Sequence, residues 1–212
     1  MRWSDEVSVP VQNTNVKLHK VVLLDCSGSM QGAKYDVAEL GVKQDYEACK
    51  GEFADYLLVE FSIDKREQLH DFTKPLVFKP YFSGTALYKT IHEVFNSLLK
   101  NTPKEDKVLI QVFTDGQDEH SRGYKEEARR AIEKCNSIGW TVTFVGTEED
   151  VAFVQANLSI DSTNTLVHDN TAKGVKMSFE SYSEATSLYT KAVKRGEVVT
   201  KNFFTKSIKT NE

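Results

Sequence analysis

Short runs of consecutive, mainly apolar residues that end in polar turns most constrain how this chain folds. Residues 20–24 form one such run, which ends at Asp25, and residues 108–113 form another, which leads into Thr114-Asp115-Gly116. A run of this kind is typical of a strand buried on both faces, as in a parallel sheet. The segments between such strands must then supply helices that cover the sheet.

Segments with helical periodicity alternate with the strand-like runs. The clearest is residues 86–100, where apolar side chains recur on one helical face: Leu87, Ile91, Val94, Phe95, Leu98 and Leu99. Other helices are predicted over residues 33–49, over about 128–138 with an end at Gly139, over 150–158 and around 175–193. Other strands are predicted over 56–63, 141–145 and 165–167, and a weaker edge element over 68–72 and 76–78. The order predicts an α/β fold with a doubly wound, mostly parallel sheet of about six strands and helices on both faces.

The length and composition predict a single globular domain. The chain has 212 residues, of which 40% are hydrophobic and 27% charged, enough for one sizeable core. We expect an N-terminal extension over residues 1–17, the domain over 18–196, and a partly disordered C-terminal tail over 197–212.

Charge and cysteine content narrow the classes of partner and compartment. The net charge of -4, without a basic cluster, argues against nucleic-acid binding. No run approaches the length of a membrane span, and the N-terminus lacks the apolar stretch of a signal peptide. Three widely spaced cysteines suggest a reducing compartment. We therefore expect a cytoplasmic protein that binds neither nucleic acid nor membranes.

Oxygen-bearing side chains gather where the predicted strands end. Asp25, Ser27 and Ser29 follow the first strand, Asp115 follows the strand over 108–113, and Thr85 precedes the helix over 86–100. In an open parallel sheet, ligands bind at the carboxyl ends of strands where the strand order reverses. A set of carboxylate and hydroxyl oxygens favours a hard cation, Mg²⁺ or Mn²⁺.

These motifs carry a resemblance to a known family. The Asp25-Cys26-Ser27-Gly28-Ser29-Met30 segment, then Gly84-Thr85-Ala86-Leu87, then Phe113-Thr114-Asp115-Gly116 resemble the von Willebrand factor A (VWA) domain, over roughly residues 18–195. The family has a Rossmann-like fold, and its metal-ion-dependent adhesion site combines a DxSxS element with a distant Thr and a distant Asp. The short chain looks most like the stand-alone intracellular members from bacteria and phages.

The resemblance implies a role for each residue. Ser27, Ser29 and Thr85 would be direct hydroxyl ligands of Mg²⁺ or Mn²⁺, while Asp25 and Asp115 would act through bound water. In another state of the site, Asp115 could coordinate the ion directly. A partner protein would complete the shell with an Asp or Glu carboxylate, so we expect a binding module and no enzymatic activity. The loop residues Asp118, Glu119 and His120 are candidates for partner contact.

Three other interpretations remain open at this stage. Ser27, Ser29 and Thr85 could simply cap helices. Asp25 could be the nucleophile of a Mg²⁺-dependent phosphotransferase or phosphatase, although Ser27 stands where that class places a second Asp as proton donor. A metal could also stabilise the fold without capturing a partner.

Overall fold

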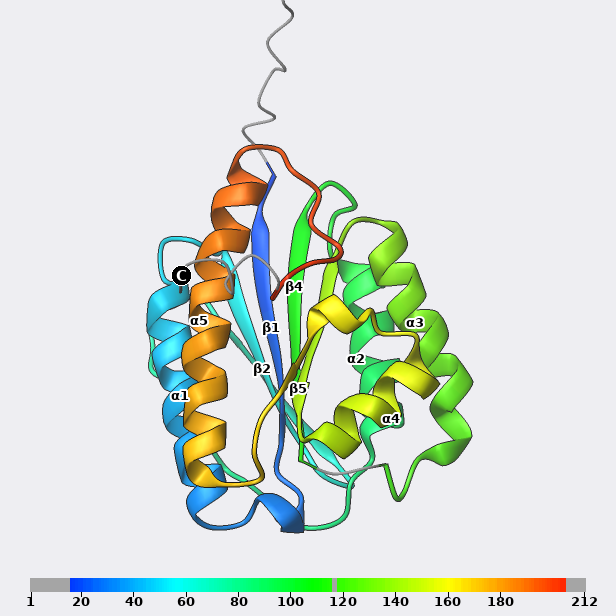
Figure 1. The fold of residues 1–212 in the computed structure, drawn as a ribbon. Helices are drawn as coiled ribbons and strands as arrows, with labels where there is room; N and C mark the ends of the chain where they lie inside the picture. The colour runs from blue at the N-terminus through cyan, green and yellow to red at the C-terminus, as the bar shows by residue number, and fades with distance from the viewer. Residues whose placement is uncertain (1–15, 116–117, 205–212) are drawn as a thin grey trace, which may run out of the picture.

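The computed structural model describes residues 16–115 and 118–204 as a layered α/β domain (Figure 1). Its strands are β1 (Leu18–Asp25), β2 (Asp55–Phe61), β3 (Lys65–His70), β4 (Lys107–Phe113), β5 (Thr141–Gly146) and β6 (Thr165–Val167). Its α-helices are α1 (Ala33–Cys49), α2 (Leu87–Asn101), α3 (Lys125–Ser137), α4 (Glu148–Leu158) and α5 (Ala172–Lys194). Short 3-10 turns η1 (Gly28–Met30), η2 (Arg122–Tyr124) and η3 (Ser162–Asn164) lie in the loops.

The strands form a mixed sheet in the order β3-β2-β1-β4-β5-β6. All neighbours pair in parallel except β2 and β3, which are antiparallel. Helices α1 and α5 cover one face, and α2, α3 and α4 cover the other (Figure 1). The strand order reverses between β1 and β4, so the predicted fold class is confirmed.

Each face of the sheet has its own hydrophobic core, and the core under α5 contains one buried cation. Lys20 is fully buried in β1, where its ammonium pairs with Asp45 of α1 at 3.2 Å and lies 4.3 Å from the ring centroid of Tyr182. Burying an ammonium is costly unless a partner compensates the charge. Asp45 also accepts a hydrogen bond from the Tyr56 hydroxyl at 2.9 Å, which keeps this buried carboxylate satisfied.

The edge of the sheet differs most from expectation. β3 begins earlier than predicted, at Lys65, and residues 76–78, which we expected to extend the edge, form no strand. Pro75 and Pro80 flank that segment and cannot donate the backbone hydrogen bonds of a ladder. The long connection from β3 to α2 is therefore irregular.

The described ends of the chain pack onto the domain. Phe203 and Phe204 are buried against Tyr182, at ring-centroid distances of 5.1 and 5.8 Å, so these two residues of the predicted tail belong to the core. The Lys17 backbone N–H donates to Asp106 Oδ1 at 2.9 Å. The remainder of the predicted extension and tail, residues 1–15 and 205–212, lies outside the described residues.

Two further observations concern the cysteines and the helices. Cys26, Cys49 and Cys135 are all buried and free of disulfides. Among the residues that the structure describes, none of the helices is both long enough and apolar enough to cross a membrane.

The N-terminus of α2 is capped by a residue from another loop. Asp118 is buried, and its Oδ2 accepts the Tyr88 backbone N–H at 2.8 Å. Its Oδ1 accepts the Ser121 backbone N–H at 2.7 Å, and the Ser121 hydroxyl accepts the Lys89 N–H at 3.0 Å. A carboxylate at a helix N-terminus satisfies unpaired N–H groups and complements the helix dipole. This contact ties the loop after β4 to the helix that begins beside Thr85.

We predict that Asp118→Ala lowers the free energy of unfolding by about 1–2 kcal/mol, the usual cost of losing a helix cap. Urea denaturation followed by circular dichroism measures the change. Asp71→Ala is the matched control, because Asp71 accepts similar hydrogen bonds from Thr73 in an exposed turn that supports no helix. Equal stability of Asp118→Ala and the wild type would contradict this role for the cap.

Candidate metal centre

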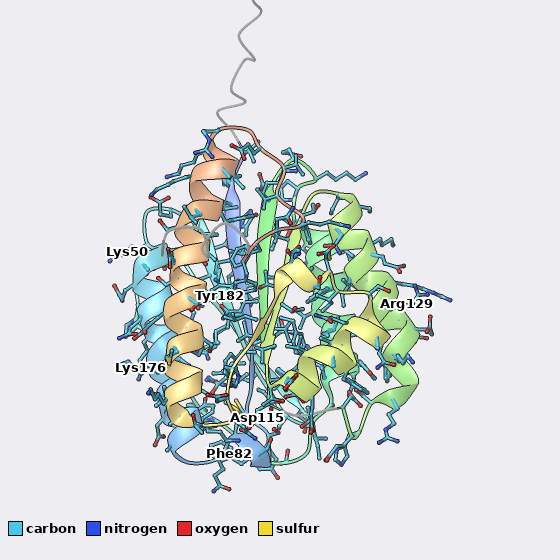
Figure 2. All side chains as sticks on the ribbon, in the orientation of Figure 1. Lys50, Phe82, Asp115, Arg129, Lys176 and Tyr182 are labelled. Carbon is cyan, nitrogen blue, oxygen red and sulfur yellow. The ribbon has the colours of Figure 1, made fainter. Side chains whose placement is uncertain are left out.

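Three loops converge at the carboxyl end of the sheet. The loop after β1 is joined to the β3–α2 connection by the Gly28 N–H, which donates to the Ser83 carbonyl at 2.7 Å. The same connection is joined to the loop after β4, because the Thr85 carbonyl accepts the N–H groups of Glu119 and His120 at 3.0 and 3.1 Å. Figure 2 shows Asp115 at this edge of the molecule. The structure thus brings together the three segments that carry the predicted ligands.

Asp25 is a fully buried carboxylate with both oxygens engaged. Its Oδ1 accepts the Ser27 N–H at 2.7 Å, and its Oδ2 accepts the Thr114 hydroxyl. Burial raises the pKa of Asp25 to about 7, although the hydrogen bonds from Thr114 and Ser27 act against this rise. The charge of Asp115 contributes to the raised pKa, which places the two carboxylates in one electrostatic environment.

The two serines connect Asp25 to Asp115. Their hydroxyl oxygens lie 3.0 Å apart, and the Ser29 hydroxyl donates to Asp115 Oδ1 at 2.6 Å. A hydroxyl that gives its proton to a carboxylate keeps its oxygen lone pairs for another partner. This arrangement suits an oxygen ligand of a cation, with the carboxylate held behind it.

None of the three hydroxyls caps a helix, so the capping interpretation is wrong. Ser27 stands at the N-cap position of η1, but its side chain accepts no hydrogen bond from the backbone N–H groups of that turn. The N-cap of α1 is Gly32, and the N-cap of α2 is Ala86, which leaves the capping of α2 to Asp118. The Thr85 hydroxyl has no hydrogen-bond partner among residues 16–115 and 118–204, although the residue is only 4% exposed.

Lys34 is a charged neighbour of the site that sequence reasoning missed. Its ammonium forms an ion pair with Asp115 Oδ2 and donates to Asn170 Oδ1 at 2.9 Å. The available signal was its place in the first turn of α1, where a lysine opposes the helix dipole and needs a compensating acid. Thr114 was part of the predicted motif, but its hydrogen bond to Asp25 was not anticipated.

The three residues of the predicted partner loop differ in burial, because one is buried and two are exposed. Asp118 is buried as the cap of α2, which accounts for its position without a partner. Glu119 and His120 are exposed, and the His120 ring lies against Gly84, where an added Cβ would approach Cε1 to 2.1 Å. A side chain at residue 84 would therefore require the exposed His120 ring to move. Partner contact by this loop remains a prediction.

The site differs from metal centres built mainly from acids, cysteines or histidines. Within the described parts of the chain, no group of three or more His, Cys, Asp or Glu side chains could hold a metal ion. The predicted set has two carboxylates, Asp25 and Asp115, and takes its other oxygens from hydroxyls. Its chemistry suits only a hard cation that accepts neutral oxygen ligands.

Comparison with known proteins places the fold. No family model matches the sequence, and no curated protein matches it. Solved structures with a similar fold include proximal thread matrix protein 1 from the mussel byssus, with a TM-score of 0.61 and 15% identity over 78% of this chain and 46% of that one. Another is the ArnB paralog VWA2 from Sulfolobus acidocaldarius, with a TM-score of 0.56 and 17% identity over 79% and 45%.

A third similar structure is the PilB minor pilin from Streptococcus sanguinis, with a TM-score of 0.54 and 11% identity over 85% of this chain and 62% of that one. The present chain therefore spans less than two thirds of each of these neighbours. At such low identities the likeness concerns the fold alone. The domain has a VWA-like fold.

Proposed function

We propose that this protein is a metal-dependent protein-binding module. Mg²⁺ or Mn²⁺ would be held by the hydroxyls of Ser27, Ser29 and Thr85, with Asp25 and Asp115 acting through bound water. The ion would supply a Lewis-acidic position that accepts an Asp or Glu carboxylate from a partner protein. A VWA-like fold suits an interaction module, and this set of residues makes the interaction depend on metal.

The hydrogen-bond pattern of the hydroxyls carries the proposal. The Ser29 hydroxyl gives its proton to Asp115, and the Ser27 hydroxyl lies 3.0 Å from it. The Thr85 hydroxyl, on the adjoining connection, has no partner among the described residues. Capping does not explain these hydroxyls, whereas a hard cation would use the oxygen of each one.

The charge distribution favours binding over tight sequestration of the ion. Two carboxylates beside a divalent ion balance its charge if they bind directly, but they leave it electrophilic if water intervenes. In the structure both carboxylates are already engaged, Asp25 by Ser27 and Thr114, and Asp115 by Ser29 and Lys34. These contacts hold the acids behind the hydroxyls and favour indirect roles for them.

The phosphotransferase alternative requires Asp25 to attack phosphorus. Its side chain is fully buried, and both of its oxygens accept hydrogen bonds, from Ser27 and Thr114. A carboxylate in this state is poorly placed to meet a substrate, and Ser27 offers no acidic proton for a leaving group. We therefore favour binding. A metal that only stabilises the fold remains the second alternative, which the capture experiment below separates from partner binding.

Metal binding predicts a thermal shift that depends on one hydroxyl. At a free Mn²⁺ concentration about 100 times its Kd, binding adds about 2.7 kcal/mol to the stability, which raises the melting temperature by several degrees. Thr85→Val replaces only the hydroxyl, with a methyl group of similar size, so we expect the metal-free protein to keep its melting temperature and to lose most of the shift. Differential scanning fluorimetry with and without Mn²⁺ measures both.

Thr90→Val is the matched control for this experiment. Thr90 is also buried near the start of α2, but its hydroxyl donates to the Ala86 carbonyl at 2.9 Å within the helix. This variant should keep the full metal-induced shift, whatever its own stability. Equal shifts in the wild type and Thr85→Val would remove Thr85 from the ligand set, and a wild type that does not respond to Mn²⁺ would overturn the proposed function.

Partner capture should require both the ion and the intact ligand set. Immobilised wild type with Mg²⁺ should retain a protein from native lysate that EDTA releases and that Thr85→Val fails to retain. Replacing the contacting Asp or Glu of that protein with its amide should abolish retention, because an amide brings no charge to the ion. Retention unaffected by EDTA would favour a metal that serves the fold alone.

We expect no turnover of a generic aryl phosphate in the presence of Mg²⁺. The assay follows release of the coloured phenol, with Asp25→Asn as the diagnostic variant. Turnover by the wild type that disappears in Asp25→Asn would establish the phosphotransferase alternative in place of binding.

A further inference from the structure

Asp115 already has a cation at one of its oxygens, supplied by this chain. The Lys34 ammonium pairs with Oδ2, while Oδ1 accepts the Ser29 hydroxyl at 2.6 Å. The Asp115 side chain is completely buried, whereas the Lys34 side chain is 20% exposed. A buried carboxylate without a positive partner is strongly unfavourable, so this ammonium stabilises the loop after β4.

The position of Lys34 indicates that the contact is specific to the tertiary structure. Lys34 lies in the first turn of α1, where its charge opposes the positive end of the helix dipole. The ammonium is instead fixed by Asp115 and by Asn170, which lie 81 and 136 positions away in the sequence. Three segments, the start of α1 and the loops after β4 and β6, therefore meet at one charge.

The same carboxylate belongs to the ligand set of the proposed metal site. A divalent ion held by Ser29 would lie close to Asp115, because that serine donates its proton to Oδ1. The Lys34 ammonium would then repel the ion, and both cations would be neutralised by the same Asp115 carboxylate. Two positive charges several ångströms apart repel each other far more strongly in a partly buried site than at an exposed surface.

We infer that Lys34 is a built-in competitor of the divalent ion: its ammonium neutralises Asp115 in the metal-free protein and lowers the affinity of the site for metal. This inference rests on the proposed function and adds a means of setting its metal threshold. Lys34 therefore has opposite effects on the stability of the metal-free fold and on the affinity for the metal. The metal-free fold gains stability from Lys34, while the metal-bound state gives up part of its binding free energy.

Lys34→Met tests both effects, since it keeps most of the aliphatic length and removes the charge. We expect a lower melting temperature without metal and a Kd for Mn²⁺ that is tighter by roughly tenfold or more, because the repulsion is gone. Titration followed by the electron paramagnetic resonance signal of free Mn²⁺ gives the Kd, and fluorimetry gives the melting temperature. A purely structural salt bridge would lower the stability without tightening metal binding.

Two control variants accompany the test. Lys34→Arg keeps the positive charge and should stay near the wild type in Mn²⁺ affinity. Lys43→Met removes a charge from α1 that pairs with Glu39 and lies over the Phe78 ring, and it should leave the Mn²⁺ affinity unchanged. If Lys34→Met is too unstable without metal, its Mn²⁺-induced rise in melting temperature, expected to exceed that of the wild type, replaces the titration.

The results distinguish the competitor role of Lys34 from the metal site itself. Unchanged or weaker Mn²⁺ binding by Lys34→Met, with measurable binding by the wild type, overturns the competitor role and leaves the metal site in place. Absence of Mn²⁺ binding by the wild type overturns the proposed function, and the competitor role falls with it.

Discussion

The parallel pairing of β1 with β4 is the constraint on which the candidate site depends. In this register Leu24 lies opposite Phe113, so the residues that follow, Asp25 at the end of one strand and Thr114 after the other, become neighbours. The Thr114 hydroxyl donates to Asp25 across that junction. A shift of the register would separate these groups and turn alternate side chains to the other face of the sheet. The sheet therefore fixes the two acidic loops before any ligand is considered.

The need to compensate buried negative charge determines the contacts of the carboxylates around that junction. Asp25 is satisfied by a backbone N–H and a hydroxyl, whereas Asp115 is satisfied by a hydroxyl and the Lys34 ammonium. Asp118, on the same loop as Asp115, uses its buried carboxylate to cap the N-terminus of α2. The same chemical group thus serves three purposes in one small region. The hydrogen-bond partners of each carboxylate, more than its place in a motif, indicate what it is free to do.

Much of this architecture could be predicted because it depends on local patterns. The buried strands, the amphipathic helix α2 and the carboxyl-edge location of Asp25, Thr85 and Asp115 all follow from periodicity and strand order. The start of the edge strand β3 was misplaced because its polar residues, most of them half-buried, carry no hydrophobic pattern. The contacts of Phe203 and Phe204 with Tyr182 and the capping by Asp118 were not predicted, since each depends on a contact distant in sequence.

The sequence by itself determined the alternation of strands and helices and the chemical nature of the candidate ligands, which are hydroxyl and carboxylate oxygens in a fixed order. Only the tertiary structure decided the state of those groups. It showed that the serines and Thr85 do not cap helices, and it brought Lys34 onto Asp115 from 81 positions away. The reason is physical: local patterns encode which surfaces are buried, whereas the partner of a buried charge is chosen by the packing of distant segments.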